Sequence, residues 1–287
     1  MGEMSMEIRC VGVVGCGVMG GGIAQLCAAK GYRVVVIEKD AAVLKKGVNG
    51  IESAFEKLAA AGKITQIQQE TWLSHVHADT DFGRLDTCDF VIEAVTENLA
   101  LKKSVFKTLD GICPSRTIFA TNTSVLPVIE MAHATARPEK VIGTHFLTPP
   151  PVIPLLELVR TLQTSDDTVQ VTRSFGETLG KKVIVSKDTP GFIVNRVLTS
   201  ILFNAVRLYE QGIATKQDID TAMTQGLGLP MGPFGLIDLI GMDTIELGSD
   251  ALFSELNEDQ YRCPVTIRRM VSAGMLGRKS GKGFYDY

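Results

Sequence analysis

Residues 11–20 read Val-Gly-Val-Val-Gly-Cys-Gly-Val-Met-Gly, so three glycines in the spacing GxGxxG directly follow a run of small and β-branched residues. Gly15 permits a tight turn after a strand, Gly17 lets the backbone approach a phosphate, and Gly20 allows close packing of the following helix. The free N–H groups and dipole at the start of that helix favour an anion. The stretch therefore predicts a dinucleotide-binding unit formed by Gly15, Cys16, Gly17, Val18, Met19 and Gly20.

The next apolar run indicates which dinucleotide is bound. It ends at Glu38, 18 positions after Gly20 and near the roughly 20-residue spacing typical of the acid that binds a ribose. A carboxylate there accepts hydrogen bonds from the 2′-hydroxyl and repels a 2′-phosphate, so Glu38 predicts NAD rather than NADP. Neighbouring Lys39 weakens this preference, and a solvated charge at the strand end is the alternative interpretation of Glu38.

Short apolar runs alternate with helical patterns through the first half of the chain. Nearly continuous apolar runs are typical of parallel strands that are buried on both faces. The predicted strands cover residues 8–14, 33–37, 90–94, 117–120 and 141–146, with further candidates at 155–159 and 182–185, and the predicted helices cover residues 21–30, 41–61 and 99–109. This alternation predicts the α/β fold class, with an N-terminal Rossmann-type doubly wound sheet.

The pattern changes near Asp188-Thr189-Pro190-Gly191. Beyond it, residues 192–211 predict one long helix, and residues 216–225 predict a second helix with Thr215 as its N-cap. We therefore expect an NAD-binding Rossmann domain at residues 1–188 and a smaller all-α domain at residues 189–287.

The composition narrows the class of protein. Apolar residues make up 45% and charged residues 21% of 287 residues, as in globular proteins, and the net charge of −3 argues against nucleic acid as a partner. Six scattered cysteines without metal-ligand spacing predict reduced thiols and no metal site, and His75 and His77 are interpreted as solvated. The N-terminus has no secretory pattern and no apolar run is long enough for a bilayer, so we expect a soluble cytoplasmic protein without membrane association.

Unusual polar residues gather at the ends of predicted strands. Thr121-Asn122-Thr123-Ser124 follows one strand, and His145 lies at the end of another. The carboxyl ends of strands in a doubly wound sheet meet at the edge where ligands bind. These side chains are therefore expected to face the cofactor crevice.

Several motifs in one order resemble the L-3-hydroxyacyl-CoA dehydrogenase family, in particular its short-chain type that acts on 3-hydroxybutyryl-CoA. The resemblance covers nearly the whole chain. Besides the glycine-rich start, it rests on Val-Ile-Glu-Ala-Val-Thr-Glu-Asn (91–98), Asn-Thr-Ser (122–124), Gly-Thr-His-Phe (143–146), Asp-Thr-Pro-Gly-Phe-Ile-Val-Asn-Arg (188–196), Pro-Met-Gly-Pro (230–233) and Gly-Arg-Lys-Ser-Gly-Lys-Gly-Phe-Tyr (277–285).

The resemblance implies an NAD-dependent oxidoreductase with four residues at the reaction. His145 matches the base that removes the 3-hydroxyl proton, and Glu157 matches the carboxylate that orients it. Ser124 matches a hydroxyl that binds the reacting oxygen, and Asn195 matches a substrate-positioning amide. Chemistry agrees, because histidine titrates near neutral pH and a carboxylate fixes its tautomer. The alternatives are a structural His145, a solvent-facing Glu157, a helix-capping Ser124 and a solvated Asn195.

The resemblance also implies ligand contacts away from the reacting atoms. Glu97, Lys102 and Lys279 match residues near the cofactor, although surface charges often have no such role. Ser53 and Lys63 lie in the region that contacts CoA in the family, and plain solubility charges are the alternative there.

The chain departs from the family at a few positions. Thr148 stands where the family usually has an asparagine near the nicotinamide, and a hydroxyl offers fewer hydrogen bonds than an amide. Val125 replaces a second serine, and Pro154 stands where a lysine is common. These changes leave the acid–base pair intact and bear on substrate geometry and chain-length preference.

Two other functions stay open at this stage. One is an NAD-dependent dehydrogenase of a free hydroxy acid, similar to lambda-crystallin and L-gulonate 3-dehydrogenase, and the other is a non-catalytic NAD-binding protein. For the leading interpretation the partner is an acyl-CoA, and the family resemblance implies a homodimer formed through the C-terminal domain, which also contributes to substrate binding.

Overall fold

The computed structural model describes residues 6–287. The chain divides into two compact units, Met1–Thr189 and Pro190–Tyr287. The division falls within residues 188–191, where the pattern of the sequence changes from alternating strands and helices to helices alone.

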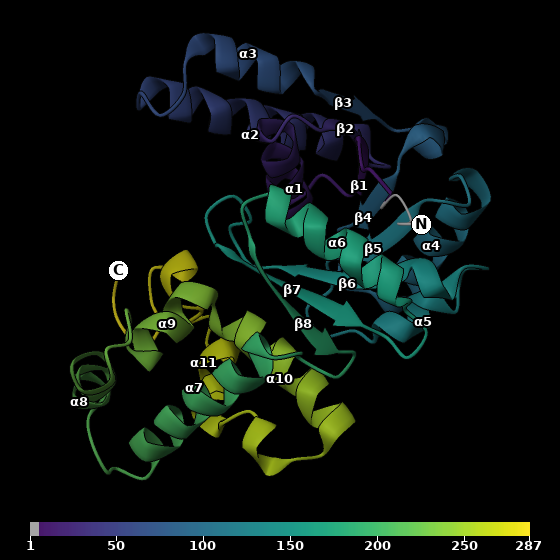
Figure 1. The fold of residues 1–287 in the computed structure, drawn as a ribbon. Coiled ribbons are helices and arrows are strands. Elements are labelled where there is room, and N and C mark those ends of the chain that lie inside the picture. Colours follow the sequence, from purple (N-terminus) through teal and green to yellow (C-terminus); the bar gives the residue numbers. More distant parts are fainter. Residues whose placement is uncertain (1–5) are drawn as a thin grey trace. The chain divides into compact units, whose positions relative to one another are not determined.

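An eight-stranded sheet forms the centre of the first unit (Figure 1). The strand order is β3-β2-β1-β4-β5-β6-β7-β8, and every neighbouring pair is parallel except β6 and β7, which are antiparallel. This is the predicted doubly wound sheet, extended by strands at both edges. The strands are β1 (Cys10–Val14), β2 (Arg33–Ile37), β3 (Val76–Asp79), β4 (Phe90–Glu93), β5 (Ile118–Thr121), β6 (Val141–Phe146), β7 (Leu155–Arg160) and β8 (Lys182–Lys187).

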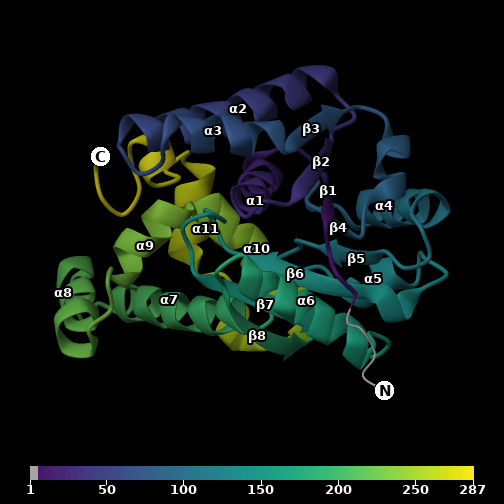
Figure 2. The same cartoon turned by 45° about the horizontal axis from the view of Figure 1, so that its top comes forward.

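Helices connect the strands of the first unit, and α2 and α3 run side by side in Figures 1 and 2. Several begin at a side-chain cap: the Asp40 carboxylate accepts from the backbone at the start of α2, Thr65 forms a capping box for α3, and Ser165 caps α6. The elements are α1 (Val18–Ala29), α2 (Ala41–Ala60), α3 (Gln66–Ser74), η1 (Phe82–Thr87), α4 (Leu99–Ile112), α5 (Val128–Ala132), η2 (Pro138–Lys140) and α6 (Asp166–Thr178).

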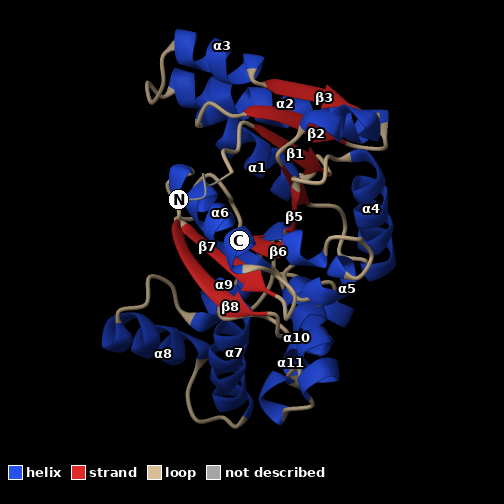
Figure 3. Ribbon diagram, turned by 45° about the vertical axis from the view of Figure 1, so that its right-hand side comes forward, coloured by secondary structure: helices blue, strands red, loops and turns tan. Residues whose placement is uncertain are grey.

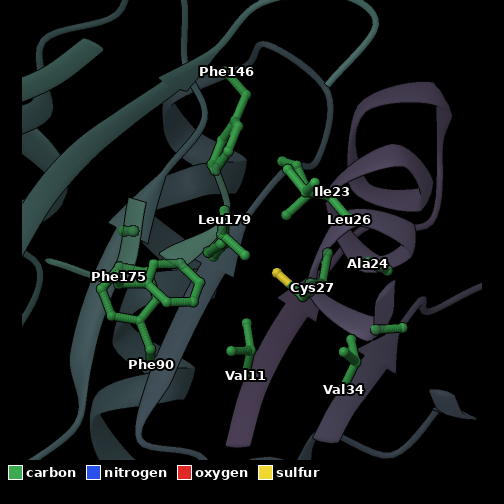
Figure 4. Packing of buried hydrophobic residues seen from close by; sticks show 14 of the residues in the cluster. Val11, Ile23, Ala24, Leu26, Cys27, Val34, Phe90, Phe146, Phe175 and Leu179 are labelled. Carbon is green, nitrogen blue, oxygen red and sulfur yellow. The ribbon is translucent and has the colours of Figure 1, made fainter. Parts of the chain in front are cut away.

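The main core of this unit lies between one face of the sheet and helices α1, α2 and α6. Val11 and Val34 of the sheet belong to the same buried cluster as Ile23 of α1 and Phe175 of α6 (Figure 4). The rings of Phe175 and Phe90 lie 4.8 Å apart. Burying such side chains supplies most of the favourable energy of folding, at about 25 cal/mol per Å² of apolar surface.

Helix α4 packs on the opposite face of the sheet. The ring of Phe106 in α4 meets the ring of Phe119 in β5 edge-to-face, with 6.1 Å between the centroids. Helices therefore cover both faces, which explains why the strands read as apolar throughout rather than alternating.

The second unit is helical (Figure 3). Its core gathers Phe203, Phe234 and Phe284, and the last two rings lie 4.7 Å apart. The buried Asp238 carboxylate accepts the backbone N–H groups of Phe284 and Tyr285, which fixes the C-terminal segment to this core. The elements are α7 (Val194–Glu210), α8 (Lys216–Thr221), η3 (Ala222–Gly226), α9 (Pro233–Ile240), α10 (Met242–Leu256), η4 (Asp259–Tyr261), α11 (Val265–Ser272) and η5 (Arg278–Ser280).

The structure tests the predictions for the cap at Thr215 and for the two histidines His75 and His77. Thr215 caps α8 as predicted, because its hydroxyl accepts from the N–H of Asp218. The prediction of a solvated His75 is wrong: the ring is half-buried, with Nδ1 3.0 Å from the carbonyl oxygen of Ala28, whereas His77 is exposed. Among the helices of the described residues, none is long and apolar enough to cross a membrane.

Candidate active site

The glycine turn has the close contacts that its sequence predicts. Gly15 has φ +99°, a conformation that other L residues rarely adopt, and its N–H donates to the carbonyl of Ile37 at 2.7 Å. A Cβ atom on Gly20 would lie 1.8 Å from the carbonyl oxygen of Gly15. Neither position accepts a side chain, so β1 and α1 meet at a distance that only glycine allows.

Gly17 and the start of α1 remain open to a ligand. A Cβ atom on Gly17 would meet no described atom within 4 Å, and Val18 beside it is 80% exposed. No side chain of the described residues caps α1, in contrast to α2 with its Asp40 cap. The first-turn N–H groups of α1 are therefore suited to hold a pyrophosphate, and the residues present fit a dinucleotide.

Glu38 lies directly beside this turn. The Glu38 carboxylate is half-buried at the end of β2 and accepts the backbone N–H of Cys16 at 3.1 Å. The Cys16 side chain is 2% exposed, and its carbonyl oxygen would lie 2.2 Å from a Cβ atom on Gly47 of α2. Cys16 is therefore held by Glu38 through its backbone N–H and is packed against α2, and Glu38 lies directly beside the glycine turn.

A buried ion network follows β4, where the sequence motif placed two glutamates and a lysine. Lys102 is 1% exposed, and its Nζ lies 2.8 Å from Glu93 Oε1 and 3.3 Å from Glu97 Oε2. Burial raises the pKa of the Glu93 carboxyl, and Lys102 opposes that shift. Pairing of the three side chains offsets part of the cost of burying them.

Glu97 connects this network to the segment that contains Ser124. Its Oε1 accepts the hydroxyl of Thr123 at 2.5 Å and the backbone N–H of Ser124 at 3.0 Å. The hydroxyl of Thr121 donates to Glu93 Oε2 at 2.7 Å. Two carboxylates therefore hold the polar segment after β5, and Glu93 is a site residue that received no role from sequence reasoning.

His145 and Glu157 face each other across neighbouring strands. The antiparallel register of β6 and β7 pairs the two residues directly, which puts their side chains on the same face of the sheet. His145 Nδ1 lies 2.8 Å from Glu157 Oε2, and the side chains are 3% and 0% exposed. The solvent-facing alternative for Glu157 is therefore wrong. A carboxylate only accepts hydrogen bonds, so Nδ1 is the donor in a hydrogen bond to the Glu157 carboxylate.

Asn122 connects the carboxyl ends of β5 and β6. Its Oδ1 accepts the backbone N–H of Phe146 at 3.0 Å, and Asn122 itself is 9% exposed. The residue after His145 is thus fixed to the segment before Ser124. Asn122 lies inside the Asn-Thr-Ser motif, which was the available signal for it, but sequence reasoning gave it no function.

Thr148 lies against the glycine turn. Its hydroxyl donates to the thioether sulfur of Met19 at 3.0 Å, and Pro150 lies 3.0 Å from the position that a Cβ atom on Gly22 would take. The proline-rich segment after β6 therefore packs on the first turns of α1. Thr148 and Met19, both predicted at the cofactor, are brought together.

The remaining predicted residues belong to α2, the segment after it and the C-terminal unit. Asn195 is the second residue of α7 in the C-terminal unit, and Lys279 in η5 of that unit has its Nζ 2.5 Å from Asp243 Oδ1. Ser53 is half-buried in α2, and Lys63 is exposed just beyond that helix. Residues 6–287 contain no cluster of His, Cys, Asp and Glu side chains that suits a metal ion.

Known proteins that are similar to the chain span both units. The family model for the NAD binding domain of 3-hydroxyacyl-CoA dehydrogenase matches residues 10–189, and the model for its C-terminal domain matches residues 191–287. The chain is 43% identical to the 3-hydroxybutyryl-CoA dehydrogenase of Mycobacterium tuberculosis over 286 residues, which is 99% of this chain and 100% of that protein.

Similar proteins also occur beyond the bacteria, and the fold agrees with solved structures. The mitochondrial hydroxyacyl-coenzyme A dehydrogenase of Homo sapiens is 40% identical over 98% of this chain and 91% of that protein. The crystal structure of (S)-3-hydroxybutyryl-CoA dehydrogenase from Ralstonia eutropha matches with a TM-score of 0.94 and 40% identity, covering 98% of this chain and 99% of that one. The chain therefore belongs to the 3-hydroxyacyl-CoA dehydrogenase family and is an NAD-dependent dehydrogenase of that family.

Proposed function

We propose that the chain interconverts (S)-3-hydroxybutyryl-CoA and acetoacetyl-CoA, with His145 as general base and acid and Glu157 as its partner. The observation that carries this proposal is the buried 2.8 Å hydrogen bond between His145 Nδ1 and Glu157 Oε2. A buried carboxylate beside a histidine at a strand end is a common device for proton transfer near neutral pH.

The two residues divide the proton work. Glu157 holds the proton on Nδ1, so that Nε2 takes the proton from the 3-hydroxyl group. The ring then becomes an imidazolium, and Glu157 stabilises its charge. In the reductive direction His145 returns the same proton to the forming alkoxide. NAD, when bound, supplies the chemistry of hydride transfer at C3.

Other residues bind and orient. The glycine turn and Glu38 hold NAD, and the half-buried Glu38 carboxylate favours it over NADP. Thr148 contributes to the cofactor site beside Met19, whose sulfur its hydroxyl contacts. Glu97 and Lys102 support the same crevice, and with a 1% exposed side chain Lys102 acts through Glu97.

The substrate contacts follow from the residue types that match the family. Ser124 and Asn195 each carry a hydrogen-bond donor for the substrate oxygen atoms. Ser53 and Lys63 offer a hydroxyl and a positive charge to the phosphates of CoA. Lys279, in the C-terminal unit, matches a residue near the cofactor in the family and is assigned the same position here.

We also propose a cytoplasmic homodimer. All six cysteines are free thiols, as is typical of a reducing compartment. Large apolar side chains of the C-terminal unit are exposed, and pairing of two copies through this unit would cover them. They include Val197, Leu227, Leu239, Leu247 and Val265.

The experiment is a substrate panel that follows oxidation of NADH or NADPH by absorbance. It compares acetoacetyl-CoA with longer 3-ketoacyl-CoA thioesters and runs NAD-dependent oxidation of L-gulonate as the free hydroxy-acid arm. We expect the highest kcat/KM with acetoacetyl-CoA and NADH. Turnover of L-gulonate without turnover of any thioester would overturn the proposal, as would a clear preference for a long-chain substrate.

A further inference from the structure

Two cysteines lie in contact at the amino ends of the strands, whereas the glycine turn lies at the carboxyl end of β1. Cys10 is the first residue of β1, whereas Gly15 follows its last residue, and Cys88 directly follows η1. Their Sγ atoms are 3.5 Å apart although the residues are 78 positions apart in the chain. Both side chains are buried, with exposed fractions of 6% and 0%.

The backbone around the pair is fixed on both sides. The N–H of Asp89 donates to the carbonyl of Cys10 at 2.9 Å, and the N–H of Cys10 donates to Asp89 Oδ2 at 3.0 Å. Cys88 Sγ also lies 3.3 Å from the position of a Cβ atom on Gly12. The two sulfur atoms, 3.5 Å apart, must approach by about 1.5 Å to reach the S–S bond length of about 2.05 Å.

Cys10 lines a pocket on the protein surface. A cavity of about 520 Å³ is lined by Cys10 together with Glu7, Arg9, Arg33, Thr87, Asp89 and Arg116. Arg116 and Asp89 form an ion pair at 3.3 Å, and Arg9 pairs with Glu7 at 2.6 Å. The polar lining makes the cavity suitable for a small, neutral, polar oxidant such as a hydroperoxide.

The two thiols differ in acidity. The hydrogen bond with Cys88 lowers the pKa of Cys10 to about 7, against the opposing effects of burial and Asp89 and with help from Arg33 and Thr87. The same hydrogen bond raises the pKa of Cys88, and burial adds to that shift. By contrast, burial raises the pKa of Cys27 and Cys113 to about 12. A thiolate is the reactive form, so the pair contains one nucleophile and one resolving thiol.

We propose that Cys10 and Cys88 form a peroxide-sensitive dithiol that closes to a disulfide across β1 and the segment before β4. The Cys10 thiolate attacks one peroxide oxygen, the O–O bond breaks, and Cys10 sulfenic acid and hydroxide form. The Cys88 sulfur then attacks Cys10 Sγ, the S–O bond breaks, and the oxygen leaves as water with the Cys88 proton. The two thiols lose two electrons, and the peroxide gains them.

This property is independent of the dehydrogenase chemistry. The dithiol lies at the amino end of β1, and the cofactor turn lies at its carboxyl end. Disulfides in a reducing compartment are usually transient and redox-sensing, which matches a pair with one low-pKa member that lines a pocket. A thiol reductant therefore returns the enzyme to its dithiol form.

The test treats the full-length, folded wild-type protein with hydrogen peroxide, blocks remaining thiols in denaturant, and maps the peptides by mass spectrometry. We expect a mass loss of two hydrogens and a cross-linked peptide that joins Cys10 to Cys88, both reversed by dithiothreitol. The rate of oxidation should rise with pH through about 7. Because this test uses the wild-type protein, its outcome does not depend on the folding of a variant.

Matched variants identify which cysteines form the cross-link. Cys10→Ser and Cys88→Ser should each abolish the cross-link, whereas Cys113→Ser, at a neighbouring buried thiol, should keep it. Acetoacetyl-CoA turnover should be the same before and after oxidation. Over-oxidation of Cys10 without a cross-link, a cross-link to Cys113, or unreactive thiols at a tenfold molar excess of peroxide would each overturn the proposal.

Discussion

At the scale of single residues, the proposed mechanism depends on a carboxylate that is buried beside one histidine. Glu157 is 0% exposed and hydrogen-bonded to His145. A charge on its carboxylate is therefore compensated only while this pairing is kept. An uncompensated buried charge is costly, and a neutral amide in its place removes the charge that stabilises an imidazolium.

Glu157→Gln should therefore lower kcat for acetoacetyl-CoA reduction by on the order of 10²–10⁴-fold and leave the KM for NADH within about twofold. Steady-state kinetics of the purified variant measure both numbers. Glu177→Gln, at an exposed position in α6, is the control and should behave as wild type. A variant at position 157 with unchanged kcat would remove Glu157 from the mechanism.

Residue identities at the site were largely predictable, but residue environments were not. The order of motifs pointed to His145, Glu157 and Glu38, and the structure puts His145 against Glu157 and Glu38 against the glycine turn. Lys102 was predicted as a cofactor contact, yet its Nζ lies between two glutamates in the interior. A pattern of residue types does not show which charged side chains become buried, because burial depends on packing between segments that are far apart in the chain.

At the scale of elements, β1, the turn and α1 form one unit whose glycines have separable roles. Gly20 has no room for a Cβ atom, whereas Gly17 has room but faces the ligand side of the turn. A substitution at each position therefore affects a different property.

Gly17→Ala should fold with a thermal midpoint close to wild type and raise the KM for NADH by about tenfold, because the methyl group occupies the path of the pyrophosphate. Gly20→Ala should instead fail to fold stably, since its methyl group overlaps the Gly15 carbonyl. Gly50→Ala, at an open position in α2, is the control for the added methyl group. A Gly17→Ala protein with normal NADH kinetics would contradict the cofactor assignment of this turn.

The ion network after β4 is a second unit at this scale. Lys102→Met leaves Glu93 and Glu97 without their common cation and should destabilise the protein by about 3–5 kcal/mol. Lys103→Met changes the next residue, whose ion pair with Glu130 is 41% exposed on the lysine side, and should cost about 0–1 kcal/mol. Urea unfolding of both variants gives the comparison; equal stabilities would contradict a structural role for the Lys102 pair.

Most strands and several helices were predicted, and the missed elements include α3, α6 and β3 of the first unit. Strand β3 and helix α3 were missed, because β3 is an edge strand with exposed members and α3 has no fully buried residue. Helix α6 was also missed, although Phe175 lies in the main core, because polar residues dominate its sequence. Apolar periodicity detects an element only when the residues on its buried face are themselves mostly apolar.

At the scale of the whole molecule, each unit has its own core, and the apolar side chains left exposed on the C-terminal unit point to association. We expect light scattering of the purified protein to give twice the 31.0 kDa mass of one chain over the micromolar range. A mass of one chain at these concentrations would contradict the proposed homodimer, without bearing on the catalytic pair.

The central claim is that His145 moves the proton in an NAD-dependent reaction of a 3-hydroxyacyl-CoA thioester. Its most direct test is the turnover of acetoacetyl-CoA with NADH by the wild-type protein and by His145→Gln, with NADH binding by both proteins measured by fluorescence. We predict that the wild type oxidises NADH, and that His145→Gln binds NADH normally but turns over on the order of 10³-fold more slowly. Wild-type turnover by His145→Gln would contradict the account.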